Sequence, residues 1–515
     1  MRQANWRYHN KNTSDKSMPN NMQQPTQDNT QNHEYFDVII VGAGLSGIGA
    51  AVHLQQDSPN KTYAIVEGRE AIGGTWDLFR YPGIRSDSDM YTLGYNFKPW
   101  TSSEGIANGK DIREYISSTA KEHNIDSNIR FGHKVIHSSW SSKTARWTVE
   151  ILLTATGETR FYDCNFLLCC TGYYNYDHGY EPKFSGSEDF KGDIIHPQKW
   201  DENYDYSDKK VVVIGSGATA VTLVPAMTDK AKHVTMLQRS PSYVMSLPQD
   251  DPMVNLLRKL FPETWVYRIT RTRNIALTSL MYKFCQTFPN AARGLMQRIM
   301  KKEVGDDFDM KHFTPSYNPW DERLCAVPDG DLFEALRAGT ASIVTDHIDH
   351  FTETGIQLKS GESLEADIII TATGLDVELF GKMTMSVDGK AFNANEKMVY
   401  RGVLLEDLPN AGMVFGYTNA SWTLKADLIT EWMCRLLNHM DATGKKIVIP
   451  KNMDPTIAHK PFVDMQSGYV QRALKKAPLQ GSKLPWKLYQ NYALDLVTLR
   501  FGKVNDKTLD FSNPQ

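Results

Sequence analysis

The stretch that decides the fold is Phe36-Asp37-Val38-Ile39-Ile40-Val41-Gly42-Ala43-Gly44-Leu45-Ser46-Gly47. A short apolar run that ends in glycines at this spacing predicts a buried strand, a tight turn and a helix, which together begin a βαβ unit. The first glycine makes the turn, the second lets backbone approach a pyrophosphate, and the third lets the helix pack closely. Because the helix N-terminus adds partial positive charge, this turn predicts a dinucleotide site. Its expected contacts are Gly42, Gly44, Leu45, Ser46 and Gly47.

The residue that ends the second strand of this unit indicates which nucleotide binds. That strand is Tyr63-Ala64-Ile65-Val66, and Glu67 follows it, 25 residues after Gly42. A carboxylate in this position accepts hydrogen bonds from the hydroxyls of an unphosphorylated adenosine ribose. The first unit therefore predicts a site for FAD or NAD.

A second βαβ unit repeats the pattern. The strand Val211-Val212-Val213-Ile214 runs into the turn Gly215-Ser216-Gly217-Ala218-Thr219-Ala220, where alanine replaces the third glycine, a tolerated variant. The matching strand end is Arg239, 24 residues after Gly215, and Ser240 follows it. A guanidinium binds a ribose 2′-phosphate through two charge-assisted hydrogen bonds, whereas a carboxylate would repel it. The second unit therefore predicts an NADPH site.

Composition places the chain among ordinary globular proteins and excludes several classes. Its 515 residues suggest about three domains and a large buried core. Lysine plus arginine (57) nearly balance aspartate plus glutamate (60), which argues against a nucleic-acid binder. Six scattered cysteines without a CxxC pair exclude a disulfide framework and zinc ribbons, and indicate a reduced, cytoplasmic protein without a metal site. No apolar run reaches about 18 residues, so no transmembrane helix is expected.

Two nucleotide sites in one chain, flavin first and nicotinamide second, imply hydride transfer from NADPH to FAD. The reduced flavin then needs an acceptor. A disulfide reductase would carry a redox-active cysteine pair near the first unit, but no cysteine precedes Cys164. Oxygen activation is the remaining common outcome, so the sequence favours an oxygenase.

Three further motifs stand between and after these units. The first is Gly73-Gly74-Thr75-Trp76, followed by Tyr81-Pro82-Gly83 and Asp87. The second is Phe190-x-Gly192-x-x-x-His196-x-x-x-Trp200-Asp201, and the third is Ala372-Thr373-Gly374-Leu375-Asp376. In this order they resemble the two fingerprints and the second domain crossover of the Baeyer–Villiger monooxygenases.

The resemblance extends from about Phe36 to about Phe511 and is greatest to one branch of these flavoenzymes. Residues 74–90 and 318–325 look like the branch that contains the ethionamide-activating and long-chain alkane monooxygenases. The resemblance implies an α/β fold with two Rossmann-like dinucleotide-binding domains and a mostly helical insertion. The implied boundaries are 35–174 and 372–515 for a split FAD domain, 175–250 and 326–371 for the NADPH domain, and 251–325 for the insertion. Residues 1–34, with 12 Asn or Gln, are expected to form a disordered tail.

The resemblance also implies a chemistry. NADPH would reduce FAD, and a C4a-peroxyflavin formed with O₂ would insert one oxygen atom into apolar ketones, giving esters, or oxidise sulfides and thioamides. The matching positions make Arg323 the cation that stabilises the peroxyflavin anion, and Asp87 the carboxylate that orients it. The residues implied to contact FAD are Gly74, Thr75, Trp76 and Asp87. His196 and Trp200 would couple the domain linkers to NADPH binding.

Several alternatives stay open. Arg323 could instead form a structural ion pair with Asp321 or Glu322. Ketone-specialised enzymes usually have Lys before this arginine and a Tyr-Tyr pair after it, but here Glu322 and Asp331-Leu332-Phe333 occupy those places, so simple cyclic-ketone specificity is not expected. Other candidate functions are hydroxylation of long alkanes, N- or S-oxidation, and a nucleotide-binding redox sensor without turnover.

Residues 252–303 differ from the rest of the chain. We expect them to be helical, and they carry ten Lys or Arg against Glu263 and Glu303. Large apolar residues are interleaved with these charges. They are Leu256, Leu257, Leu260, Phe261, Trp265, Leu280, Met281, Phe284 and Leu295. Such helices either cap the NADPH domain or present a cationic amphipathic face to an anionic membrane.

Overall fold

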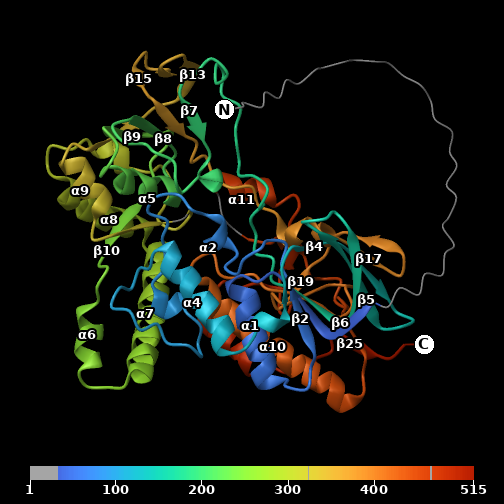
Figure 1. The fold of residues 1–515 in the computed structure, drawn as a ribbon. Coiled ribbons are helices and arrows are strands. Elements are labelled where there is room, and N and C mark those ends of the chain that lie inside the picture. The colour runs from blue at the N-terminus through green and yellow to red at the C-terminus, as the bar shows by residue number, and fades with distance from the viewer. Residues whose placement is uncertain (1–32, 323, 464–466, 515) are drawn as a thin grey trace, which may run out of the picture. The chain divides into compact units, whose positions relative to one another are not determined.

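A computed structural model describes residues 33–322, 324–463 and 467–514, and Figure 1 shows the order of its elements. The predicted catalytic Arg323 and nearly all of the predicted tail at 1–34 lie outside the described residues. The described chain combines α-helices with two larger β-sheets, which confirms the predicted α/β class.

The first sheet is built around the stretch at Phe36. Its parallel part contains, in order, β3 (Ile129–Arg130), β2 (Tyr63–Val66), β1 (Glu34–Val41) and β6 (Thr159–Cys169). β1 begins two residues before Phe36, because Glu34 and Tyr35 also pair with β6. α1 (Leu45–Asp57) connects β1 to β2. The glycine turn therefore lies at the C-terminal end of the central strand.

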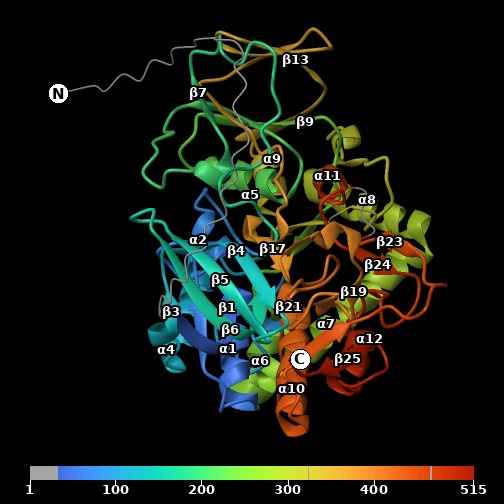
Figure 2. The ribbon, with the colours of Figure 1, turned by 90° about the vertical axis from the view of Figure 1, so that its right-hand side faces the viewer.

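The C-terminal half of the chain completes this sheet. The further strands are β4 (His133–Ser141), β5 (Arg146–Leu153), β17 (Thr384–Val387), β18 (Lys390–Phe392), β19 (Val399–Tyr400), β20 (Leu404–Leu405) and β21 (Ala411–Met413). β17 pairs with β4 and β21 pairs with β6, both in parallel (Figure 2). α10 (Trp422–Thr443) packs against α1. One sheet thus combines strands from 34–169 and 384–413.

The second sheet is wholly parallel and contains the second glycine motif. Its order is β12 (Ala341–Thr345), β9 (His233–Gln238), β8 (Lys210–Ile214), β16 (Ile368–Ile370) and β7 (Asp193–Ile195). α5 (Ala218–Met227) follows the glycines after β8. Parallel sheets are covered on both faces, which explains the unbroken Val and Ile runs of β8 and β16.

Residues 251–325 are largely helical, as predicted. The helices are α6 (Pro252–Arg258), α7 (Glu263–Thr287) and α8 (Pro289–Val304). α8 packs against α9 (Asp331–Arg337) and β10 (Val244–Leu247), beside the second sheet. α7 packs instead against α3 (Met90–Leu93), which belongs to the core around the first sheet. The helical segment therefore does more than cap the second sheet.

Smaller elements surround the two sheets. β10 pairs with β11, and β13, β14 and β15 form a small antiparallel sheet. The remaining bounds are α2 (Thr75–Leu78), α4 (Gly109–Glu122), β11 (Cys325–Pro328), β13 (Ile348–Thr352), β14 (Gly355–Leu358), β15 (Ser363–Glu365), β22 (Ile447–Pro450), β23 (His459–Pro461), α11 (Gly468–Ala473), β24 (Leu479–Gly481), α12 (Tyr492–Asp495) and β25 (Leu509–Ser512).

A buried ionic network anchors α7 to the elements around the first sheet. Arg271 of α7 donates to the backbone carbonyls of Tyr91 and Gly94, each at 2.8 Å. Its Nη2 lies 3.5 Å from Oδ2 of Asp427 on α10. The other carboxylate oxygen of Asp427 lies 3.3 Å from Nε2 of His53 on α1. Because buried charges are costly unless they are paired and hydrogen-bonded, this network fixes the position of α7.

Stability should fall above neutral pH through His53. Burial alone lowers the pKa of His53, but the hydrogen bonds of Asp427 and Asp57 and the charges of Asp427 and Glu431 raise it from 6.5 to about 9. The charged form therefore stabilises the fold fully below pH 6.5, and this contribution, on the order of 3 kcal/mol, is lost as the pH rises through 9. Thermal unfolding of His53→Gln should lose this part of the pH dependence, whereas the exposed-site control His459→Gln should keep it. Parallel profiles for His53→Gln and the unaltered protein would contradict the assignment.

Candidate active site

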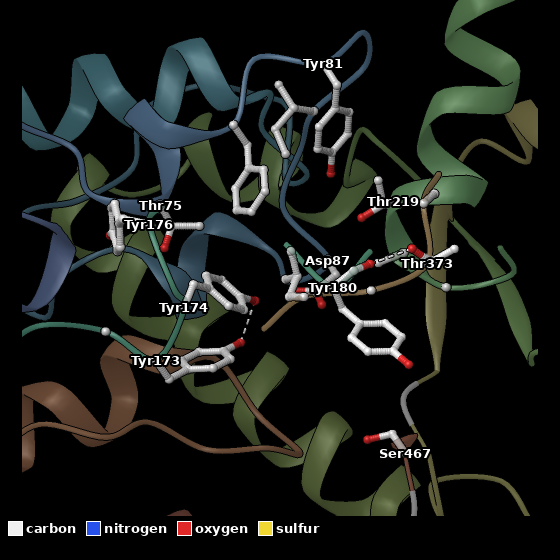
Figure 3. A pocket seen from close by; sticks show the side chains of 18 of the residues that line it. Thr75, Tyr81, Asp87, Tyr173, Tyr174, Tyr176, Tyr180, Thr219, Thr373 and Ser467 are labelled. Atoms are coloured by element: carbon white, nitrogen blue, oxygen red, sulfur yellow. Dashed lines mark hydrogen bonds between the residues drawn. The ribbon is translucent and has the colours of Figure 1, made fainter. Parts of the chain in front are cut away.

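One cavity of about 1290 Å³ is lined by both glycine motifs. Its volume exceeds the roughly 300–1,000 Å³ of typical small-ligand pockets. Figure 3 shows part of its wall, with Thr75 and Asp87 from the first half of the chain and Thr219 and Thr373 from the segments around the second sheet. The cavity has room for more than one nucleotide.

The first glycine turn lets backbone approach the cavity closely. Gly42 has a φ of +105°, and a Cβ there would lie 2.7 Å from the carbonyl oxygen of Cys170. A Cβ on Gly74 would lie 3.0 Å from the Cα of Gly44. Gly47 is absent from the cavity wall. A Cβ there would lie 1.8 Å from the Gly42 carbonyl oxygen, so its role is close packing of α1. The residues of this turn that line the cavity are Gly42, Gly44, Leu45 and Ser46.

Glu67 follows β2 and lines the cavity. One of its carboxylate oxygens accepts a hydrogen bond from the Ala43 N–H at 2.7 Å, and the other accepts from the Arg69 N–H at 2.9 Å. Burial raises the pKa of Glu67, and these two N–H groups oppose the shift. A carboxylate has about four acceptor positions, so Glu67 can hold the glycine turn and still accept from ribose hydroxyls.

The second glycine turn lies on the same cavity. Its wall includes Gly215, Ser216, Gly217, Ala218 and Thr219. Ala220, in the first turn of α5, is instead buried in the core. Arg239 and Ser240, which follow β9, also line the cavity. The Ser216 hydroxyl donates to the Ser240 carbonyl at 2.9 Å, which ties the glycine turn to the strand end.

Arg239 is placed to meet an anion. Its side chain is exposed, and it forms no ion pair within 4 Å to any residue that the structure describes. Burial raises the pKa of Glu322, and the charge of Arg239 opposes this shift, so the two side chains share one electrostatic environment. A guanidinium in this state has its hydrogen bonds available for phosphate.

His196 and Trp200 lie outside the cavity wall. Nδ1 of His196 accepts from the Gln198 N–H at 3.2 Å, so Nε2 carries the proton that points to the Gly374 carbonyl at 3.3 Å. Burial lowers the pKa of His196, with the Gly374 bond opposing, which keeps the ring neutral. Trp200 is buried in the core of the second sheet. His196 therefore reaches the cavity through Gly374, which lines it.

The remaining predicted residues cluster around the fingerprint loop. Thr75, Trp76 and Asp87 line the cavity, and Trp76 also packs against the core around the first sheet. Arg323 lies outside the described residues, but Glu322 on one side of it lines the same cavity. The structure therefore brings Glu322 and Asp87 to one cavity.

The sequence analysis missed an aromatic wall. Tyr173 and Tyr174 line the cavity, and their hydroxyls are hydrogen-bonded at 2.7 Å (Figure 3). Tyr173 stacks on Trp422 of α10 with ring centroids 5.2 Å apart. Nε1 of Trp422 donates to the Ser46 hydroxyl at 2.7 Å, next to the first glycine turn. In the sequence, the available signal for this wall was the pair Tyr173-Tyr174, which directly follows Thr171-Gly172.

The sequence analysis also missed an ion pair between the two halves of the site. Arg85, in the fingerprint loop, lines the cavity, and its Nη2 donates to Oδ1 of Asp331 at 3.3 Å. A second guanidinium nitrogen of Arg85 contacts the other carboxylate oxygen. Asp331 begins α9, beside the second sheet, so the pair joins the fingerprint loop to that sheet's helices.

Comparison with known proteins identifies the family. The flavin-binding monooxygenase-like family matches residues 103–453, and an NAD(P)-binding Rossmann-like domain matches residues 40–100. The FAD-containing monooxygenase EthA of Mycobacterium tuberculosis is 53% identical over 481 residues, which cover 93% of this chain and 98% of that protein. The chain belongs to the flavin-binding monooxygenase-like family. It is a flavoprotein monooxygenase, and the predicted family resemblance is confirmed.

Further relatives agree with this assignment. The probable FAD-binding monooxygenase AlmA of an Acinetobacter species is 50% identical over 478 residues, which cover 92% of this chain and 96% of that protein. A solved structure of an oxidised steroid monooxygenase bound to NADP is 21% identical, with a TM-score of 0.70 over 93% of this chain and 100% of that one. An open structure of cyclohexanone monooxygenase is 18% identical, with a TM-score of 0.72 over the same shares. These structures show the shared fold.

The described residues contain neither a candidate membrane-spanning helix nor a candidate metal site. No helix in that part of the chain is long and apolar enough to cross a membrane. No group of three or more His, Cys, Asp or Glu among the same residues could hold a metal ion.

Substitution of Gly47 should abolish flavin binding. In Gly47→Val the added Cβ cannot coexist with the Gly42 carbonyl 1.8 Å away, so α1 must shift and the turn must open. Overpacking of this kind costs about 1–3 kcal/mol or more, enough to disorder the site without unfolding the chain. Flavin absorbance per protein, measured beside circular dichroism, checks this outcome. Gly294→Ala is the control, because a Cβ there meets nothing within 4 Å; full flavin content in Gly47→Val would refute the packing role.

Proposed function

We propose that this chain uses NADPH, FAD and O₂ to insert one oxygen atom into apolar ketones, giving esters, and to oxidise sulfides and thioamides. The observation that carries the proposal is the single cavity lined by both glycine motifs and by the fingerprint residue Asp87. NADPH consumption with and without a long-chain methyl ketone, followed by mass analysis of the products, tests it.

The residues of the first motif fit FAD. The N-terminus of α1 and the bare backbone at Gly42 and Gly44 suit a pyrophosphate, and the free acceptor positions of Glu67 suit the ribose. We propose that Gly74, Thr75 and Trp76 contact the rest of the cofactor. Bound FAD would accept hydride and activate oxygen.

The residues of the second motif fit NADPH. The N-terminus of α5 faces the cavity through Ser216 to Thr219, and Arg239 and Ser240 would bind the 2′-phosphate. His196 would act indirectly, because its Nε2–H holds the Gly374 carbonyl at the second crossover. Trp200 would act in the same way, through the core beneath that crossover.

We propose that Arg323 supplies fixed positive charge beside the reacting oxygen and that Asp87 orients it. Charge that develops during oxygen transfer is best stabilised by a preorganised cation in a site that excludes water. Asp87 and Glu322 line the same cavity, which supports this pairing. Tyr173 and Trp422, which line the same cavity, would help to exclude water from it.

The type of substrate is the finer part of the proposal. Aromatic side chains of the cavity, with Phe79 and Trp422 among them, favour apolar substrates. Hydroxylation of long alkanes and N- or S-oxidation are the alternatives, since the relatives share the general monooxygenase chemistry without fixing the substrate. Esters, alcohols and sulfoxides differ in mass and retention, so one product analysis distinguishes the three reactions.

We also propose that the protein contacts an anionic membrane peripherally. Several large apolar side chains of residues 252–303 are exposed beside cations that form no ion pair with any described residue, which supports the membrane interpretation of this segment. Apolar substrates concentrate in such membranes, so this contact would bring the enzyme to them.

Arg239→Ala should weaken NADPH binding selectively. Loss of a bidentate contact to the 2′-phosphate costs on the order of 2 kcal/mol, or about thirty-fold in affinity. Steady-state kinetics should show the KM for NADPH rising by about this factor while the KM for NADH hardly changes. Lys232→Ala, which removes an exposed cation outside the cavity wall, should change neither. Equal effects of Arg239→Ala on both nucleotides would place the phosphate elsewhere.

Arg323→Ala should abolish oxygenation in a folded, flavin-loaded protein. Without the cation, oxygen transfer loses its electrostatic stabilisation, typically 10²- to 10³-fold for one such group. NADPH oxidation should continue as uncoupled release of hydrogen peroxide, measured against product formed. Arg337→Ala, on an exposed arginine of α9, serves as the control. Normal yields of ester or sulfoxide from Arg323→Ala would show that the cation lies elsewhere.

A further inference from the structure

We propose that the tip of the α6–α7 hairpin is the surface by which this protein docks on an anionic lipid bilayer. The inference rests on the membrane contact proposed above and names the residues that make it. Figure 1 shows α6 and α7 side by side, joined by a short loop. The hairpin tip consists of the exposed residues Leu256, Lys259, Leu260, Phe261, Trp265 and Arg268.

The hairpin tip exposes large apolar side chains. Leu256, Leu260 and Trp265 are 58, 66 and 56% exposed. Apolar side chains that gather on an exposed surface mark interaction sites. Tryptophan suits a bilayer surface in particular, because its ring is apolar and its N–H stays hydrated at the headgroup level. The guanidinium carbon of Arg268 lies 6.0 Å from the ring centre of Trp265, so the cation and the ring are neighbours on this surface.

The charges of the hairpin divide into internal and external ones. Arg258 at the end of α6 pairs with Glu263 at 2.9 Å. Arg273 of α7 pairs with Asp251, which caps α6. These pairs brace the hairpin and neutralise the only two acidic residues of the segment 251–287. The cations left without an ion pair to any described residue are Lys259, Arg268 and Lys283.

The cationic surface continues along α7. One line of residues spaced by three or four along α7, beginning at Trp265, is exposed throughout. They are Trp265, Arg268, Thr272, Ala276, Leu280 and Lys283. At 1.5 Å per residue this face is about 27 Å long. A helix with this composition lies in the plane of the bilayer, with its apolar side chains among the headgroups.

An anionic bilayer satisfies this surface better than a second copy of the chain does. A two-fold dimer would place the same patch against itself, so Lys259 and Arg268 would face like charges. The acidic groups of the hairpin are already paired and could not compensate them. Lipid phosphates compensate each cation, and the acyl chains accept Leu260 and Phe261.

Vesicle sedimentation with the FAD-loaded full-length protein tests the proposal. The unaltered protein should bind vesicles of phosphatidylglycerol and phosphatidylcholine at low salt, bind less at high salt, and ignore pure phosphatidylcholine. Lys259→Gln with Arg268→Gln should weaken partition about thirty-fold, which corresponds to about 1 kcal/mol for each cation. Leu260→Ser with Phe261→Ser should also weaken it. Lys143→Gln with Phe501→Ser, exposed residues outside the hairpin, should bind normally.

Each outcome has one meaning. Normal binding by both hairpin variants would show that the hairpin tip is not the docking surface, although the proposed membrane contact itself would still hold. Absence of low-salt binding, or binding indifferent to salt and lipid charge, would overturn both. NADPH-dependent oxidation of a small dissolved sulfide, run on every variant, should be unchanged; its loss in the hairpin variants alone would assign these residues to folding or catalysis and overturn the proposal. Inactivity of all proteins with normal vesicle binding would contradict only the proposed chemistry.

Discussion

A side chain at position 47 would lie 1.8 Å from the Gly42 carbonyl oxygen, and this constraint sets where α1 begins. Because α1 packs this closely on β1, its N-terminal N–H groups point into the cavity rather than into solvent. The carboxylate of Glu67 then holds the turn from the other side through the Ala43 N–H. Backbone, helix terminus and strand-end carboxylate are thus fixed together before any ligand binds, which is the preorganisation that a nucleotide site needs.

The two halves of the site meet through polar contacts between distant segments. Arg85, in the cavity wall, donates to Asp331 of α9, and His196 holds the carbonyl of Gly374 at the second crossover. Farther out, Arg271 ties the helical segment to α10. Of these contacts, the Arg85–Asp331 pair joins the fingerprint loop to α9 beside the second sheet, His196–Gly374 joins the ends of two neighbouring strands of the second sheet, and Arg271–Asp427 lies in the core around the first sheet. Hydride transfer requires two nucleotides at a fixed separation, and contacts of this kind make the surrounding elements rigid.

Local patterns in the sequence were enough to predict both βαβ units, because a strand, its glycine turn and its helix are contiguous. The strand-end residues Glu67 and Arg239 could be assigned for the same reason, since each lies one helix beyond its glycines. The stack of Tyr173 on Trp422 could not be predicted, because it depends on how α10 packs against α1. The position of Trp200 behind the wall rather than in it is equally a result of long-range packing. The family resemblance supplied Asp87, for which no local pattern offered a role.

Helix α7 shows why hydrophobic pattern alone could not settle the helical segment. It buries Arg271 and exposes Trp265, the reverse of the usual distribution. The cost of burying the guanidinium is offset by two backbone carbonyls at 2.8 Å and by the Asp427 carboxylate. On the exposed face of α7, the described residues offer no comparable compensation, and the apolar side chains there are exposed to water. Because the buried face of α7 anchors the helix, the exposed apolar face is available for contact with another surface.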